Sequence, residues 1–166
     1  MPVIVGGSPL KIEDVVRVAR HGEKVELSAA ALGRMVCNLT IGKPRFADRE
    51  PRLTEVRLQL ERLGLRLREL IAEDAASFEA VLAAYRLPKE TDEQKSARAE
   101  SVQAAIAVAV NVPLETAERS FEVLKLLREI ADSGNPNAIS DVAVGSRLAE
   151  VAIKGASYNV AANLPT

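Results

Sequence analysis

The sequence contains few of the residues from which metal sites, disulfides and aromatic surfaces are built. Its 166 residues include one cysteine, one histidine and no tryptophan, and aromatic residues make up 3%. A single cysteine excludes an internal disulfide and a thiolate zinc site, and a lone histidine argues against a His/Cys metal site within one chain. We therefore expect no metal site and no tightly bound cofactor.

Excess charge and long apolar runs are also missing. Lys and Arg number 22 and Asp and Glu number 23, which gives a net charge of −1. This balance gives no case for binding nucleic acid or an anionic membrane, and the few aromatic residues argue against base stacking. No apolar run approaches the roughly 20 residues that span a bilayer, and the N-terminus does not resemble a signal peptide. We expect a cytoplasmic protein without nucleic acid or membrane partners.

The residues that are present predict an all-α fold. With 48% hydrophobic and 27% charged residues, the chain should form one domain over residues 1–166. Residues 1–27 read as an atypical arm, with a β-leaning start and a short helix over about 8–22. Further helices are predicted over about 28–42, 51–87, 91–110, 113–134 and 136–163, with Asn111 and Pro113 breaking the chain between two of them. We expect an up-and-down bundle of about five helices.

The predicted long helix carries a carboxylate on its apolar face. Apolar residues there step by three and four along Leu53, Val56, Leu60, Leu63, Leu67 and Leu70. Continuing the step places Asp74 and Ser77 where a bundle favours leucine. A buried carboxylate is costly unless it is paired, so Asp74 is either a satisfied structural group or part of a site.

Other polar residues are candidates for a site between helices. In the last helix Asp141 begins an inward face that ends in the amides Asn159 and Asn163. Two carboxylates on apolar faces can act as general acid and base, although each can equally bond a neighbouring backbone or face solvent. The cations near helix ends, which can bind an anion or be solvated loop charges, are Lys43, Arg45, Arg86 and Lys89.

Two further patterns concern burial. Residues 104–110 are apolar on all sides of a helix and must be enclosed, which one chain of this size does not achieve easily, so we expect a homodimer. Cys37 falls near the inward face of its helix and is expected to be a buried small residue.

Several short motifs, spread along the chain, together resemble those of a known protein family. They comprise residues 35–43, Glu73-Asp74 followed by Phe78, residues 86–89 and 112–114, Gly134-Asn135, Ser140-Asp141, Gly155-Ala156, Asn159-Val160 and Asn163-Leu164. In this order and spacing, residues from about 28 to 166 resemble the formiminotetrahydrofolate cyclodeaminase / methenyltetrahydrofolate cyclohydrolase family.

The resemblance implies a helical dimer that acts on one-carbon tetrahydrofolates. The leading hypothesis is a lyase that converts 5-formiminotetrahydrofolate to 5,10-methenyltetrahydrofolate and ammonia, as in histidine degradation. Asp74 and Asp141 would move protons. Residues that would bind the substrate are Lys43, Arg86, Lys89, Asn135 and Asn159. A methenyltetrahydrofolate cyclohydrolase is an alternative.

The start of the chain departs from this family. The glycine-rich segment with which the family opens is missing, and residues 4–28 instead resemble the N-terminus of histidine ammonia-lyase. The lyase's self-processing Ala-Ser-Gly is absent too, so no ammonia-lyase chemistry is expected. A third hypothesis is therefore a catalytically silent helical binding or assembly module that has lost the glycine-rich loop.

Overall fold

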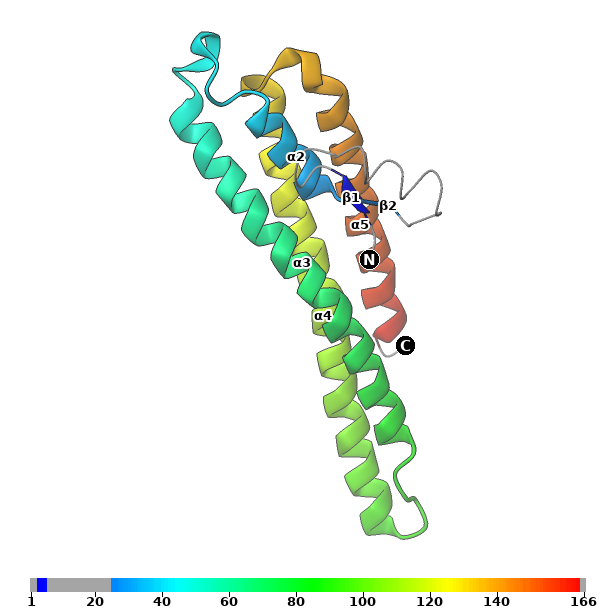
Figure 1. Ribbon diagram of the computed structural model, residues 1–166. Coiled ribbons are helices and arrows are strands. Elements are labelled where there is room, and N and C mark those ends of the chain that lie inside the picture. The colour runs from blue at the N-terminus through cyan, green and yellow to red at the C-terminus, as the bar shows by residue number, and fades with distance from the viewer. Residues whose placement is uncertain (1–2, 6–24, 165–166) are drawn as a thin grey trace. The chain divides into compact units, whose positions relative to one another are not determined.

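A computed structural model describes residues 3–5 and 25–164. Two three-residue strands, β1 (Val3–Val5) and β2 (Val25–Leu27), pair in parallel. The described residues otherwise form four α-helices, α2 (Ala29–Asn38), α3 (Glu50–Tyr85), α4 (Asp92–Ser133) and α5 (Ile139–Asn163), joined by turns that include 3₁₀ helices at Pro44–Phe46 and Pro136–Ala138 (Figure 1). The all-helical expectation is confirmed apart from the two short strands. The helix expected over 8–22 lies outside the described residues.

The chain divides into two compact units. Unit 1 comprises the described residues up to Leu65 together with Ser120–Val151, and unit 2 comprises Arg66–Arg119 together with the residues from Ala152 onward. Helices α3, α4 and α5 therefore each contribute to both units.

The core of unit 1 forms where α2 packs closely against α3 and α4. A Cβ atom on Gly33 would lie 2.8 Å from Leu60 Cδ1 and 3.0 Å from Leu127 Cδ2, so a larger residue here would force these side chains to shift. Buried side chains around it include Val36, Cys37, Leu53, Val56, Val123, Ile130, Val142 and Ala149. Each large side chain buried here contributes about 1.5–3 kcal/mol. The predicted burial of Cys37 is confirmed.

In unit 2, α3 and α4 run side by side in opposite directions (Figure 1). Helix α4 begins, close to the predicted residue 91, with a capping box. The Gln94 amide N–H donates to Thr91 Oγ1 at 3.2 Å, and the Thr91 N–H donates to Gln94 Oε1 at 3.2 Å. These reciprocal bonds satisfy donors that the first turn of a helix leaves open, and they fix where α4 begins.

The predicted apolar face of α3 is confirmed in its first half. Leu53, Val56 and Leu60 are fully buried and Leu70 is 2% exposed. Further along the helix Ser77 is buried at 6% exposure, whereas Asp74 is exposed, which is one of the alternatives that the sequence left open.

Pro113 does not end a helix, contrary to the prediction. Helix α4 continues from Asp92 to Ser133 with Pro113 inside it. The proline removes one helical hydrogen bond and costs about 3 kcal/mol in a helix interior. Val112 and Pro113 are both buried, so the packing of unit 2 offsets this cost.

The apolar segment 104–110 is not enclosed on every side. Ala109 is 8% exposed, but Val108 is 56% exposed. As expected for one chain, the described residues leave part of this segment uncovered, and the predicted homodimer stays a prediction.

Candidate functional site

A small pocket in unit 2 joins two of the predicted site residues, Asp74 and Asn159. It has a volume of about 160 Å³ and is formed by α3, α4 and α5. Its lining residues are Asp74, Ser77, Phe78, Val81, Ala109, Asn159 and Asn163. It combines a carboxylate, two amides and a hydroxyl with apolar walls, which is the usual composition of a small-molecule site.

Hydrogen bonds within the helices orient the polar groups of this pocket. Ser77 Oγ donates to the backbone oxygen of Asp74 at 2.8 Å. Asn163 Nδ2 donates to the backbone oxygen of Asn159 at 3.0 Å and to its Oδ1 at 2.8 Å. The two amides stand four residues apart on α5 and therefore on one face, so the second fixes the orientation of the first.

The carboxylate of Asp74 is available to a ligand. Among the described residues, no side chain donates a hydrogen bond to it or forms an ion pair with it, while Ser77 bonds only its backbone oxygen. A carboxylate without an internal partner, beside oriented amides, can accept a proton and return it.

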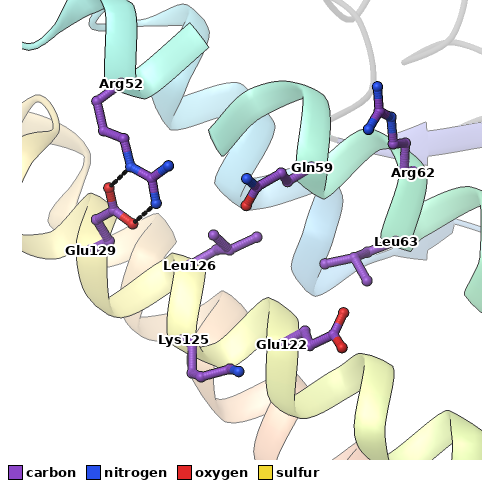
Figure 2. A pocket seen from close by; sticks show the side chains of 8 residues that line it. All are labelled: Arg52, Gln59, Arg62, Leu63, Glu122, Lys125, Leu126 and Glu129. Atoms are coloured by element: carbon purple, nitrogen blue, oxygen red, sulfur yellow. Dashed lines mark hydrogen bonds and ion pairs between the residues drawn. The ribbon is translucent and has the colours of Figure 1, made fainter. Parts of the chain in front are cut away.

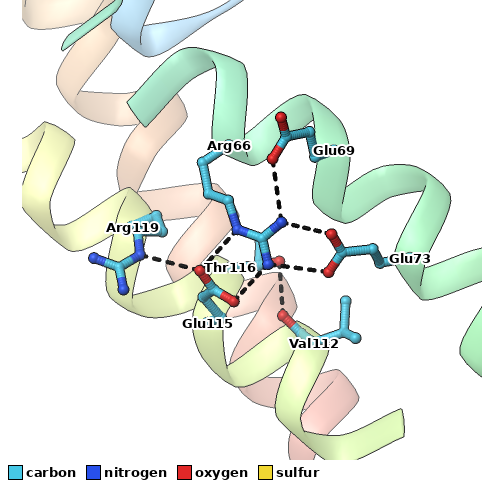
Figure 3. Close-up of polar contacts among 7 residues, drawn as sticks. All are labelled: Arg66, Glu69, Glu73, Val112, Glu115, Thr116 and Arg119. Atoms are coloured by element: carbon cyan, nitrogen blue, oxygen red, sulfur yellow. Dashed lines mark hydrogen bonds and ion pairs between the residues drawn. The ribbon is translucent and has the colours of Figure 1, made fainter. Parts of the chain in front are cut away.

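The neighbouring Glu73 is committed to a different contact, which the sequence analysis missed. Arg66 donates to both oxygens of Glu73, at 2.5 and 3.0 Å, and to both oxygens of Glu115 on α4, at 2.9 and 2.8 Å (Figure 3). Glu69 and Arg119 complete this cluster. The Arg66 hydrogen bonds hold the pKa of Glu115 at about 2, below its usual 4.5. The spacing of Arg66, Glu69 and Glu73 on one helix could have indicated part of the cluster.

The two predicted cations of unit 2 do not line the Asp74 pocket. Arg86 and Lys89 are exposed in the connection between α3 and α4. Arg86 is five residues and Lys89 eight residues beyond Val81, the last α3 residue of that pocket.

The other predicted site residues belong to unit 1. Asn135 is 8% exposed and its polar atoms are engaged: the amide N–H donates to Thr40 Oγ1 at 2.9 Å, Nδ2 donates to the Leu39 oxygen at 3.2 Å, and Oδ1 accepts from Arg45 at 3.2 Å. These bonds tie the turn before α5 to the residues that follow α2, while the Asn137 N–H donates to Asn135 Oδ1 at 3.1 Å and caps the 3₁₀ helix there. Asp141 is half-buried in the first turn of α5, and Lys43 is exposed.

Unit 1 also has a groove of about 510 Å³ between α3 and α4 (Figure 2). Arg52 and Glu129 form a two-bond ion pair at one end of the labelled side chains, at 2.6 and 2.9 Å. The remaining lining residues are Gln59, Arg62, Leu63, Glu122, Lys125 and Leu126. Charges of both signs are mixed along it, so the groove does not favour a ligand of one charge.

Two other kinds of site were sought in the described residues. They contain no group of three or more His, Cys, Asp or Glu side chains placed to hold a metal ion. No helix in the same part of the chain is long and apolar enough to cross a membrane.

Comparison with known proteins identifies the family. The family model described as formiminotransferase-cyclodeaminase matches residues 25–166. The chain belongs to this family. The match begins at residue 25, so the resemblance of residues 4–28 to histidine ammonia-lyase stays a prediction.

Sequence similarity to individual members of the formiminotransferase-cyclodeaminase family supports this assignment. The chain is 43% identical over 134 residues to the methenyltetrahydrofolate cyclohydrolase of Methylorubrum extorquens, covering 81% of this chain and 64% of the relative. It is 36% identical over 135 residues to the formimidoyltransferase-cyclodeaminase of Sus scrofa, covering 81% of this chain and 25% of the relative.

A solved structure of the family supports the fold. The crystal structure of formiminotetrahydrofolate cyclodeaminase from Thermotoga maritima matches with a TM-score of 0.71 and 27% identity, over 81% of this chain and 63% of that chain. The chain thus spans less than two thirds of the length of these family members.

Proposed function

We propose that the chain is a folate-dependent enzyme that acts on the single carbon held at N5 and N10 of tetrahydrofolate. The observation that supports this is the Asp74 pocket, with its available carboxylate and oriented amides, in a member of the formiminotransferase-cyclodeaminase family. The single buried Cys37 and the balanced charge fit a cytoplasmic enzyme.

The first candidate reaction is cyclodeamination of 5-formiminotetrahydrofolate. N10 attacks the protonated formimino carbon, the C–N bond to the departing nitrogen breaks, and ammonia leaves. Asp74 accepts the proton that N10 loses and delivers it to the leaving nitrogen, so the 5,10-methenyl product keeps the positive charge. The amides of Asn159 and Asn163 orient the substrate.

The second candidate reaction is hydrolysis of 5,10-methenyltetrahydrofolate. The 43% identity to a methenyltetrahydrofolate cyclohydrolase favours it. Water adds to the methenyl carbon, and Asp74 takes one proton from that water. The bond from this carbon to one of the two nitrogens then breaks as the new hydroxyl becomes the formyl C=O. The departing nitrogen takes up the hydroxyl proton, and the proton on Asp74 is released to solvent. The same carboxylate serves both reactions because each one moves a proton at the same bridging carbon.

The remaining candidate residues keep supporting roles in this proposal. Asp141 is the second carboxylate, and Lys43, Arg86 and Lys89 are exposed cations that can attract an anionic substrate. Asn135 acts by fixing the turn before α5, since its polar atoms are already bonded.

We also propose that the enzyme is a homodimer. On α3 of unit 2, Ile71 and Phe78 are seven residues apart, lie on one face and are 66% and 60% exposed. On α5 of unit 1, Val144 and Val151 repeat this spacing at 46% and 68% exposure. Phe78 also lines the Asp74 pocket, so a partner covering this face would border the site.

A substrate assay tests the function. Purified protein is mixed with 5-formiminotetrahydrofolate while methenyl absorbance and ammonia are followed, and separately with 5,10-methenyltetrahydrofolate while methenyl absorbance is followed. Ammonia release supports cyclodeamination, and loss of methenyl absorbance above the uncatalysed rate supports hydrolysis. A protein that catalyses neither reaction yet binds 5-formyltetrahydrofolate would be a silent binding module, and one that binds no folate would overturn the proposal.

A further inference from the structure

A second and larger groove in unit 2 adjoins the Asp74 pocket. It has a volume of about 790 Å³ and lies among the end of α3, the first turns of α4 and the end of α5. Its lining residues are Val81, Tyr85, Arg98, Ala99, Val102, Gln103, Ile106, Ala162, Asn163 and Leu164. We call it the Arg98 groove.

The Arg98 groove and the Asp74 pocket share two walls. Val81 and Asn163 line both. A ligand whose reactive end sits beside Asp74 can therefore extend into the Arg98 groove without leaving the protein surface.

Arg98 is held in a fixed position in the groove. Its Nε and Nη2 donate to the backbone oxygen of Tyr85 at 3.2 and 3.1 Å, and its guanidinium carbon lies 5.4 Å from the centre of the Tyr85 ring. A guanidinium carries five N–H donors, so two bonds to Tyr85 leave three donors for a ligand. A cation fixed in advance binds a carboxylate with a smaller loss of side-chain entropy.

The rest of the groove is suited to a flat apolar group. Val81, Val102 and Ile106 are half-buried and contribute aliphatic walls, while Gln103 supplies a polar edge. Asp74 and Tyr85 are eleven residues apart on α3, which corresponds to about 16 Å along the helix axis, so the tail and the Arg98 side chain would span this distance together. An aminobenzoyl group joined to a glutamate is about as long as three extended residues, roughly 10 Å.

We propose that the Arg98 groove binds the aminobenzoyl-glutamate tail of the folate, with the Arg98 guanidinium on a glutamate carboxylate. The inference rests on the proposed function and deepens it, because it gives the part of the substrate that does not react a site of its own. It assigns the tail to Arg98 rather than to Lys43, Arg86 or Lys89, which the sequence indicated.

A pair of ligands that differ only in the tail tests this. We would measure, by calorimetry, the affinities of 5-formyltetrahydrofolate and of its analogue in which a methylamide replaces the glutamate. The wild type should prefer the glutamate form. Arg98→Met should weaken binding of that form roughly 10- to 100-fold, as expected for a paired charge, and leave the methylamide within about twofold. Arg128→Met, an exposed arginine on the same helix, should leave both affinities unchanged.

A second variant keeps Arg98 and its contact with Tyr85. Gln103→Glu introduces a carboxylate at an exposed position of the groove and should weaken only the glutamate form. Equal loss of both ligands in Arg98→Met would mean that Arg98 only supports the fold, and would overturn the inference. Equal binding of both ligands by the wild type would overturn it too while leaving the proposed function intact. A wild type that neither binds nor converts a folate would overturn both.

Discussion

Arg66 is the residue on which the polar organisation of unit 2 depends. It joins Glu69 and Glu73 on α3 to Glu115 on α4 (Figure 3). Because the folded-state pKa of Glu115 is about 2 and its usual value is 4.5, the unfolded chain binds more protons between these values. The stabilisation from this pair is complete above pH 4.5 and is lost as the pH falls towards 2.

We therefore expect Arg66→Met to lower the thermal unfolding midpoint at pH 7. The difference from the wild type should shrink between pH 4.5 and pH 2.5, since the wild type loses the pair there as well. Circular dichroism melts across this range measure both effects. Arg147→Met is the control, because Arg147 pairs with Glu150 at 81% side-chain exposure and should change little. A difference that stays constant with pH would contradict the role of Glu115.

In the proposed mechanism, Asp74 accepts and returns the proton. Asp74→Asn should lower turnover about 10²- to 10⁴-fold, because the amide cannot accept the proton. The helical circular dichroism spectrum should not change, since the carboxylate is exposed. Glu79→Gln makes the same chemical change at an exposed position elsewhere on α3 and should retain activity. Full activity in Asp74→Asn would remove this carboxylate from the mechanism.

Cys37 gives a further prediction for a single residue. It is fully buried, and burial raises the pKa of its thiol to about 11. The thiolate that reacts with alkylating reagents is therefore scarce at pH 8. Iodoacetamide should leave the native protein unmodified by mass spectrometry and modify it once in denaturant. Rapid modification of the native protein would show that α2 opens readily.

At the scale of the elements, the approach of α2 to α3 and α4 depends on Gly33. Gly33→Ala should destabilise the protein by about 1–3 kcal/mol, because the added methyl group meets Leu60 and Leu127. The matched control is Gly155→Ala in α5, where a Cβ meets no atom within 4 Å. That change should stabilise the protein by about 0.5–1 kcal/mol through helix propensity. Urea denaturation measures both, and equal effects would contradict the packing argument.

The helices also show which parts of the structure could be predicted from the sequence. The start of α4 was predictable because Thr91 and Gln94 bond each other within one turn. The Arg66–Glu115 pair was not, since its residues lie 49 positions apart and no local pattern brings them together. The Arg98 groove was missed for a similar reason, because its walls come from three helices.

One prediction failed because packing outweighed a local rule. The helix continues through Pro113 because burial offsets its missing hydrogen bond. The apolar step along α3 drew attention to Asp74, which lines a pocket, but it could not decide whether this residue is buried or exposed. Spacing indicates which face of a helix a residue occupies, and it does not indicate what covers that face.

At the scale of the whole molecule, we expect a dimer. Light scattering after size exclusion should give twice the chain mass. Ile71→Glu should yield monomers, because it introduces a charge on the exposed apolar face of α3. Ala76→Glu, on a different face of the same helix, should leave the dimer intact. Monomers in the wild type, or dissociation by both variants, would contradict this interface.

Pro113 also has a consequence for the chemistry of the pocket wall. A proline has no amide hydrogen, so the carbonyl oxygen of Ala109, four residues earlier, lacks its usual helical donor. Ala109 lines the Asp74 pocket and is 8% exposed. A carbonyl in such a place takes its hydrogen bond from another group, from water or from a ligand. Pro113 therefore removes the usual helical donor from a residue that lines the pocket one turn away.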